Sequence, residues 1–233
     1  MSDFFRFPHT PHIVWLGSAE PRDDKVLSVE EVDELLSGEV LVEEKLDGAN
    51  VGLSLGPDGE IRAQNRGQYI EPPYSGQFTR LPGWLATHEA LLKPLLLPHL
   101  IVFGEWCAAR HSLDYSALPD WFVLFDVYDR ESDRFWSSGS RDAFARAAGL
   151  ESVPCIARRR VDVSELLAYV SQHKSCCRDG SLEGVVVRRE SGEWCEMRGK
   201  IVRADFTQAI GEHWRSRGIE WNRVLEGGGL PGS

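Results

Sequence analysis

A lysine with a carboxylate and a glycine directly behind it is the clearest indication of chemistry in this chain. Lys45-Leu46-Asp47-Gly48 closes a short apolar run, Glu44 precedes the lysine, and Asn50 completes a K-x-D-G-x-N pattern. A lysine amine is nucleophilic only when it is neutral, so covalent chemistry at Lys45 requires a lowered pKa. Nearby cations have that effect, and Lys200, an arginine and a bound magnesium ion are the candidates. Standing alone, the lysine would be a solvated residue at a strand end.

Two glutamates stand inside apolar segments, each beside a glycine. Glu105 lies in the run Phe103-Gly104-Glu105-Trp106, and Glu183 lies in Leu182-Glu183-Gly184. Carboxylates are rarely buried without a partner, so each position predicts a bound cation or a ribose hydroxyl nearby. An internal salt bridge is the alternative for each glutamate.

The apolar patterns predict helices and strands in an irregular order. Helices are expected at 28–36, 84–93, 140–148, 163–171 and 206–217, and strands at 40–46, 50–55, 100–106, 121–128, 183–189 and 193–202, with one more ending near 65–67. Ser28-Val29-Glu30-Glu31 has the spacing of a capping box, which fixes the start of the first helix. Because the elements mix without regular βαβ alternation, the sequence favours an antiparallel α+β architecture over a doubly wound sheet.

Composition and charge limit the class of protein. The 233 residues are 42% hydrophobic and carry a net charge of -10, which argues at first against a nucleic-acid partner. However, residues 1–50 hold twelve acids and four bases, whereas 198–223 holds six bases and three acids, so a local basic face and an ordinary solvated surface both stay open. The sequence shows no membrane-length apolar run, no export signal and no CxxC pair, so a soluble, cytoplasmic protein with no membrane partner is expected.

Six segments occur in an order that resembles the catalytic domain of ATP-dependent RNA ligases. They are K-L-D-G at 45–48, N-R-G at 65–67, F-G-E-W at 103–106, W-F-V-L-F-D at 121–126, L-E-G-V-V-V-R at 182–188 and R-G-K-I-V-R at 198–203. That family belongs to the covalent nucleotidyltransferase superfamily, together with DNA ligases and mRNA capping enzymes. The resemblance covers roughly residues 40–206 and implies an α+β nucleotidyltransferase domain of largely antiparallel sheets flanked by helices, with no C-terminal OB barrel.

The resemblance implies a role for each matched residue. Lys45 would be the catalytic nucleophile that takes AMP from ATP. Glu105 would bind the ribose, and Phe125 would stack on adenine through its π face. The full set that would bind ATP is Glu44, Asp47, Gly48, Asn50, Arg66, Glu105, Phe125, Lys200 and Arg203, and Glu183 with Asp47 would hold Mg²⁺ or Mn²⁺.

The last segment departs from the family pattern. Many relatives carry K-x-K, whereas Lys200-Ile201-Val202-Arg203 places a valine where the second cation would alternate. Arg198 lies on the same strand face as Lys200, and Arg203 reaches that site only through a bulge or a strand end. Which arginine substitutes for the second cation stays open.

The function that the resemblance implies is RNA joining in RNA repair. AMP would pass from the lysine to an RNA 5′-phosphate, and an RNA 3′-hydroxyl would then displace it, with an end-healing kinase or phosphatase as a further partner. A DNA ligase or a capping-type nucleotidyltransferase is the enzymatic alternative. A nucleotide-dependent RNA-end-binding protein without sealing activity is the alternative from another class.

The expected organisation is one catalytic domain over residues 1–226. It comprises an N-terminal extension with a short helix (1–39), a motif-bearing core (40–206) and a C-terminal helix (207–226), followed by a disordered tail (227–233). Phe4-Phe5-Arg6-Phe7 is expected to anchor the N-terminus to the core, with RNA stacking as the less favoured alternative.

Overall fold

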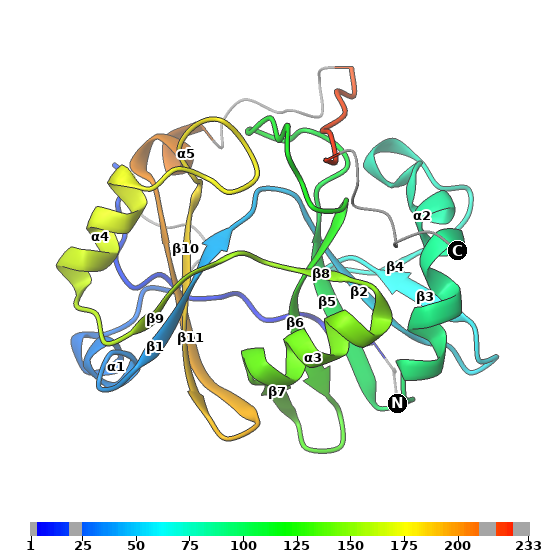
Figure 1. Cartoon of the computed structure of the whole chain (residues 1–233), viewed down its shortest axis with the longest axis horizontal. Helices are drawn as coiled ribbons and strands as arrows, with labels where there is room; N and C mark the ends of the chain where they lie inside the picture. The colour runs from blue at the N-terminus through cyan, green and yellow to red at the C-terminus, as the bar shows by residue number, and fades with distance from the viewer. Residues whose placement is uncertain (1–3, 19–24, 210–217, 226–233) are drawn as a thin grey trace.

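The computed structural model describes residues 4–18, 25–209 and 218–225, which form one continuous sheet with helices packed against it (Figure 1). Within these residues the sheet has eleven strands, paired along the path β4-β3-β2-β5-β6-β7-β11-β10-β1-β9, with β8 beside β6. All strand pairs are antiparallel except β6 with β8. The strands are β1 Val40–Lys45, β2 Ala49–Leu55, β3 Ile61–Gln64, β4 Tyr69–Ile70, β5 Leu100–Trp106, β6 Phe122–Asp129, β7 Arg134–Trp136, β8 Glu151–Ser152, β9 Cys155–Arg159, β10 Gly184–Ser191 and β11 Trp194–Val202.

The sheet divides into two halves that one short strand joins. Strands β4, β3, β2, β5 and β6 form the first half, and β11, β10, β1 and β9 form the second. Between them, the three-residue strand β7 makes two residue pairs with β6 and two with β11. These few main-chain hydrogen bonds connect the two halves only weakly. Contacts between side chains must therefore complete the junction.

Each half has its own hydrophobic core and its own helices. The helices are α1 Val29–Leu35, α2 Leu81–Leu92, α3 Ser138–Ala148, α4 Val163–Gln172 and α5 Ala204–Ala209, with the 3₁₀ turns η1 Gly76–Phe78 and η2 Lys93–Leu95. Trp84 of α2 and Phe144 of α3 pack on the first half, whereas Leu35 of α1 and Leu166 of α4 pack on the second. Figure 1 shows α1 and α4 on the side of β1 and β10, and α2 on the side of β2 and β3.

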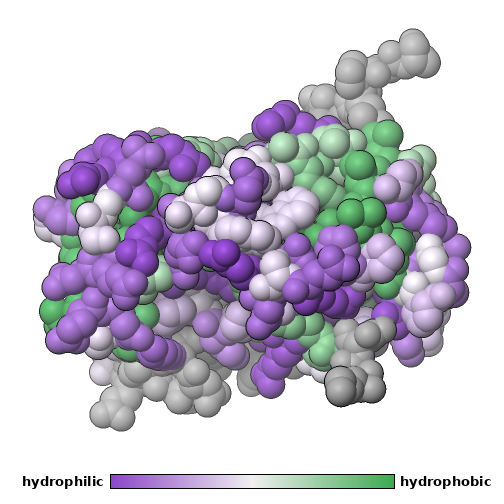
Figure 2. All heavy atoms as spheres, turned by 90° about the horizontal axis from the view of Figure 1, so that it is seen from below, coloured by the Kyte–Doolittle hydropathy of each residue, from purple (hydrophilic) through white to green (hydrophobic). Residues whose placement is uncertain are grey.

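The outer surface of the molecule is largely polar. Seen from below, most of the visible side chains are hydrophilic, and apolar ones show mainly on the side that carries α2 (Figure 2). Leu91 and Leu97, at the end of α2 and just beyond η2, are 41% and 50% exposed. None of the helices in the described ranges is both long and apolar enough to cross a membrane.

Most of the predicted elements are confirmed, including the antiparallel α+β class. Strand 100–106 has the predicted bounds, and Ser28 and Glu31 form the predicted capping box, each side chain accepting a backbone hydrogen bond from the other residue. The helix predicted at 84–93 begins earlier, at Leu81, because proline in the first turn favours helix initiation. The helix predicted at 206–217 is α5 in its described part, and residues 210–217 lie outside the described residues.

Four short strands were not predicted. These are β4, β7, β8 and β9, which have two to five residues each. Strands this short depend on pairing with distant neighbours rather than on local pattern, since β7 and β9 are held by β11 and β1.

The N-terminal segment is anchored to the sheet, as predicted. Phe5 stacks on Tyr128 with ring centroids 3.7 Å apart, and Phe7 is only 4% exposed. Farther along, the backbone of Lys200 in β11 donates to Pro11 and accepts from Ile13. The N-terminal residues therefore cross from the first half of the sheet to the second.

A glycine at the start of β10 is expected to be essential for strand pairing. A Cβ at Gly184 would lie 2.2 Å from the backbone oxygen of Ile201, so β11 would have to move. Gly184→Ala should lower the free energy of unfolding by about 1–3 kcal/mol, measured by urea denaturation. Gly38→Ala is the matched control, because a methyl group at Gly38 would have no heavy atom within 4 Å of it. Equal unfolding midpoints for both variants would contradict the close approach.

Candidate active site

The K-x-D-G segment is the crossover between the two halves of the sheet. β1 ends at Lys45 in the second half and β2 begins at Ala49 in the first, so three residues span the junction. Gly48 passes close to β5, where an added Cβ would lie 2.6 Å from the backbone oxygen of Trp106. Its N–H donates to Oε1 of Glu105 at 3.0 Å. A glycine is therefore required where the chain changes halves.

A cavity of about 620 Å³ lies at this junction, and most of the predicted residues line it. The predicted residues on its wall are Glu44, Lys45, Gly48, Asn50, Arg66, Glu105, Phe125 and Lys200. The wall also includes Arg198, one of the two candidate arginines, and residues that sequence reasoning did not assign, among them Phe7, His9, Glu43, Asp126 and Arg188. A cavity of this volume is in the range of small-molecule sites. The N-terminal segment thus contributes to the wall as well as to the core.

The Lys45 amine forms an ion pair with Glu183. Nζ lies 2.7 Å from both carboxylate oxygens, because β1 and β10 pair Lys45 with Gly184 and leave Glu183 beside it. Burial alone would lower the pKa of Lys45, but the charges of Glu183, Glu105 and Asp47 outweigh burial and raise it. The expectation that neighbouring cations lower this pKa is therefore wrong for the unliganded chain, since carboxylates surround the amine.

The two predicted glutamates both have raised pKa values. Burial raises the pKa of Glu183 to about 7, against the attraction of Lys45, and burial likewise raises the pKa of Glu105 to about 7. For Glu183 the salt-bridge alternative holds in the unliganded chain. Glu105 accepts from the backbone of Gly48 instead. Burial therefore makes both carboxyl groups harder to ionise than an exposed glutamate.

Asp47 and Glu44 use their carboxylates to hold loops. Oδ2 of Asp47 accepts from the backbone N–H groups of Ser112 and Leu113, each at 2.8 Å, and Asp47 does not line the cavity. Oε2 of Glu44 accepts from the N–H of Cys176 at 2.8 Å. The geometry thus gives Asp47 a structural role, and its predicted contact with metal stays a prediction.

The remaining predicted residues that line the cavity differ in their surroundings. Oδ1 of Asn50 is buried and has no hydrogen-bond partner among the described residues, so it is an acceptor that a ligand can satisfy. Nη1 of Arg66 lies 3.2 Å from Nδ1 of His9. The Phe125 ring packs edge-on against Phe7, with ring centroids 5.3 Å apart.

The structure separates the two candidate arginines. Arg198 lines the cavity with Lys200, pairs with Asp126 and lies over the rings of Phe7 and Phe135, at 4.6 and 4.1 Å. In contrast, Arg203 does not line the cavity, and its Nη2 lies 2.7 Å from Oδ2 of Asp205. Arg198 therefore reaches the cavity by alternation along β11, whereas Arg203, just beyond the strand end at Val202, turns to Asp205 instead.

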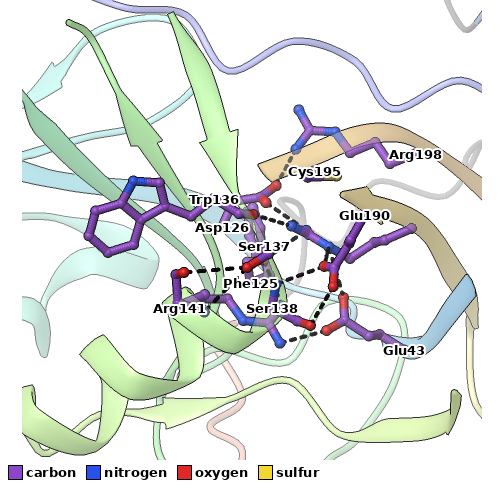
Figure 3. A network of polar contacts seen from close by, with 12 residues as sticks. Glu43, Phe125, Asp126, Trp136, Ser137, Ser138, Arg141, Glu190, Cys195 and Arg198 are labelled. Carbon is purple, nitrogen blue, oxygen red and sulfur yellow. Dashed lines mark hydrogen bonds and ion pairs between the residues drawn. The ribbon is translucent and has the colours of Figure 1, made fainter. Parts of the chain in front are cut away.

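A buried network of charges completes the junction between the halves (Figure 3). Nη1 of Arg188 in β10 lies 2.6 Å from Oδ1 of Asp126 in β6, and its Nη2 donates to the backbone oxygen of Trp136 in β7. Arg141 of α3 pairs with Glu43 of β1 at 2.6 Å. All four charged side chains are 2% exposed or less, so the network ties β1 and β10 to β6 where β7 alone would not.

Sequence reasoning missed this network although the signal was present. Glu43 and Arg188 are charged residues inside apolar strand runs, the same pattern that singled out Glu105 and Glu183. Their partners Arg141 and Asp126 lie far from them in the sequence, so no local spacing of residues could predict the pairing.

Comparison with known proteins identifies the family. No curated protein matches the sequence, but a family model described as RNA ligase matches residues 38–202. The chain belongs to the RNA ligase family. The matched region contains β1 to β11 and therefore every residue of the cavity wall except those of the N-terminal segment.

Solved RNA ligases share the fold of this family member. Naegleria gruberi RNA ligase with pyrophosphate aligns at a TM-score of 0.61 and 18% identity, over 81% of this chain and 55% of that one. A mutant of the same ligase with ATP and Mn aligns at 0.65 and 15%, over 90% and 59%. An archaeal ATP-dependent RNA ligase aligns at 0.58 and 23%, over 84% and 48%. The chain thus spans about half the length of these proteins.

The carboxylates of the site fit a sparse metal site rather than a closed one. The described residues contain no cluster of three or more histidine, cysteine, aspartate or glutamate side chains placed to hold a metal ion. Magnesium commonly takes one or two carboxylates and completes its shell with phosphate oxygens and water. Glu183 does not itself line the cavity, but its carboxylate lies 2.7 Å from Nζ of Lys45, which does, and a single carboxylate fits that pattern.

Glutamine at position 105 is expected to stabilise the protein at neutral and alkaline pH. The folded chain raises the pKa of Glu105 from 4.5 to about 7, so the folded state binds this proton more tightly than the unfolded state. The contribution of Glu105 to the unfolding free energy of the wild-type protein therefore falls as the pH rises from 4.5 through 7. Relative to wild type, Glu105→Gln should gain about 1–3 kcal/mol in unfolding free energy between about pH 4.5 and 8.

Urea denaturation at a series of pH values measures this gain. Glu39→Gln, at an exposed position, is the control for replacing a glutamate by glutamine as such. A pH-independent difference for Glu105→Gln would show that burial does not raise the pKa of Glu105.

Proposed function

We propose that this chain is an ATP-dependent RNA ligase that carries AMP on Lys45 and acts in cytoplasmic RNA repair. The observation that carries the proposal is the position of Lys45 at the junction of the two half-sheets. There it faces Arg66, Lys200 and Arg198 across a cavity of nucleotide size. Membership of the RNA ligase family and the shared fold support the proposal.

The cavity offers a suitable contact for each part of ATP. Phe125 provides an aromatic face for adenine, and Glu105 with the unsatisfied Oδ1 of Asn50 provides acceptors for the ribose hydroxyls. Arg66 and Lys200 provide the positive charge that phosphates need. Glu183 would hold Mg²⁺ or Mn²⁺, which would supply positive charge to the phosphates and would weaken the hold of Glu183 on Lys45.

The first step requires Lys45 to lose its proton. Its neutral amine attacks the α-phosphorus of ATP, a P–N bond forms, and the bond from the α-phosphorus to the bridging oxygen breaks as pyrophosphate leaves. The Glu183 ion pair opposes this step in the unliganded chain, since it holds the amine charged. Binding that engages Glu183 therefore activates the nucleophile.

RNA enters in the second and third steps. An oxygen of an RNA 5′-phosphate attacks the phosphorus of the lysine-bound AMP, the P–N bond breaks, and the amine leaves with a proton. An RNA 3′-hydroxyl then attacks the RNA 5′-phosphorus and releases AMP, which joins the ends. An end-healing kinase or phosphatase would supply 5′-phosphate and 3′-hydroxyl termini.

Loss of the Lys45 amine is expected to abolish the AMP adduct. Wild-type protein incubated with ATP and Mg²⁺ should gain the mass of one AMP, measured on the intact protein. Lys45→Ala should gain none. Lys93→Ala is the matched control, because Lys93 is also an ion-paired lysine, 2.8 Å from Glu60, but lies outside the cavity. An adduct that persists in Lys45→Ala would refute the assignment of the nucleophile.

Glu183 and Lys200 are expected to contribute to the rate of adduct formation. Glu183→Gln and Lys200→Ala should each slow it by about 10²-fold or more. The first removes the carboxylate proposed to hold the metal ion, and the second removes a positive charge that would stabilise the phosphates. Arg203→Ala should react at nearly the wild-type rate, since Arg203 pairs with Asp205 outside the cavity. Rapid-quench measurement of the adduct tests all three variants. Normal rates for the first two would mean that the site is misplaced.

The two rival functions predict different products. A DNA ligase or capping-type enzyme would form the adduct but prefer DNA ends, or GTP over ATP. An RNA-end-binding protein without sealing activity would bind ATP and form no adduct. Supplying ATP or GTP, and RNA or DNA ends, therefore separates the three.

A further inference from the structure

A second groove adjoins the proposed nucleotide cavity. It has a volume of about 560 Å³, and its wall is formed by the segment 68–78 together with Ala109, Arg110, Gly218 and Ile219. Asn65, Gln77 and Phe78 line both the groove and the cavity, so these three residues form a shared wall. Nothing in the proposed binding of ATP uses the groove.

We propose that the second groove holds the first nucleoside of the RNA strand that carries the 5′-phosphate. The proposal rests on the proposed ligase function and adds a subsite to it. After AMP transfer, adenosine and the first RNA nucleoside are joined through a 5′,5′ pyrophosphate. Two nucleosides linked this closely need two adjoining cavities, each large enough for one of them, and the structure provides that pair.

Hydrogen bonds hold two residues of the shared wall, Asn65 and Gln77, in position. Nε2 of His111 lies 2.7 Å from Oε1 of Gln77, and the backbone oxygen of Gln77 accepts from the indole of Trp106 at 2.8 Å. Oδ1 of Asn65 accepts from the N–H groups of Gly67 and Gln68, at 2.8 and 2.9 Å. This turn presents Arg66 to the nucleotide cavity while Gln68 lines the groove. A pyrophosphate crossing between the two cavities would therefore pass beside a guanidinium.

The chemistry of the groove suits a nucleoside and its following phosphate. Tyr69, Tyr74 and Phe78 line it, and aromatic rings are the usual stacking surfaces for unpaired RNA bases. Phe4 and Arg62 already contact the Tyr69 ring, and Phe78 belongs to the wall shared with the nucleotide cavity, so the half-buried Tyr74 is the stacking candidate. Arg110 lies at the groove and is paired with Glu220 at 2.7 Å.

Arg110 can exchange its ion-pair partner, Glu220, for a phosphate group of the RNA. Its side chains are 43% and 62% exposed, and exposed ion pairs contribute little to stability. A phosphodiester offers the guanidinium the same forked hydrogen bonds that a carboxylate does. Glu220 therefore competes with RNA for Arg110, and its removal should not weaken RNA binding.

The test compares Tyr74→Ala and Arg110→Gln with a matched control. The control is Arg134→Gln, because Arg134 is 41% exposed, is paired with Glu196 at 2.6 Å and lies away from both cavities. The probe is a short 5′-adenylylated ribo-oligonucleotide with a 3′ fluorophore, whose dissociation constant is measured by anisotropy over a salt series. Self-adenylation with ATP is measured on the same proteins.

Tyr74→Ala should bind the probe roughly tenfold more weakly, as expected for the loss of one stacked base. Arg110→Gln should also weaken binding and reduce the log–log salt slope by about one, whereas Glu220→Gln should bind at least as tightly as wild type. Tyr74→Phe should restore binding because the stacking face returns. All of these variants should self-adenylate normally.

This design distinguishes failure of the groove proposal from failure of the proposed ligase function. If both groove variants bind the probe like Arg134→Gln, the second groove does not hold the RNA, while normal self-adenylation would leave the ligase proposal intact. If wild-type protein fails to self-adenylate, the proposed function fails, and the anisotropy data still decide whether the groove binds RNA. Weakened binding of a 3′-hydroxyl strand alone, with unchanged binding of the probe, would assign the groove to the other end and overturn the proposal.

Discussion

The ion pair between Lys45 and Glu183 determines the state of the whole site. It forms because β1 and β10 pair in a register that sets Lys45 opposite Gly184, with Glu183 one residue before the strand. The pair satisfies two charges that burial would otherwise destabilise, and in doing so it keeps the nucleophile protonated. Under the proposed function, a ligand that takes over one partner would free the other, and a metal ion that binds Glu183 would release the Lys45 amine.

The cavity exists because the sheet is divided. Among the described strands, the short β7 is the one that pairs with both the half containing β5 and β6 and the half containing β10 and β11, and the K-x-D-G crossover spans the same gap. Buried charges complete the connection, chiefly Arg188 with Asp126 and Arg141 with Glu43. Removing one partner of such a pair would leave an uncompensated buried charge, so the network also fixes the width of the cavity. The N-terminal aromatic residues close one end, where Phe7 packs under Arg198.

The sequence was sufficient for the α+β class, the main strands and most of the cavity wall, because local periodicity and ordered motifs carry that information. It could not decide between Arg198 and Arg203, since the answer depends on where β11 ends. Asp47 was expected to hold metal, and the sequence did not show that its carboxylate accepts hydrogen bonds from the backbone of Ser112 and Leu113, which lie far along the chain. The second groove, the Arg188 network and the strands β4, β7, β8 and β9 depend on contacts between distant segments, which no local pattern encodes.

The most direct test of this account is the protonation of Lys45 itself. NMR titration of selectively labelled lysine side chains, assigned with Lys45→Ala, would give its pKa in wild-type protein and in Glu183→Gln. We predict that the pKa of Lys45 lies above the ordinary lysine value of about 10.4 in the unliganded wild type and falls in Glu183→Gln, where the amine keeps its burial but loses its counter-charge. A pKa well below that ordinary value in the unliganded wild type, unchanged by Glu183→Gln, would contradict this account, because the nucleophile would then be free of the ion pair.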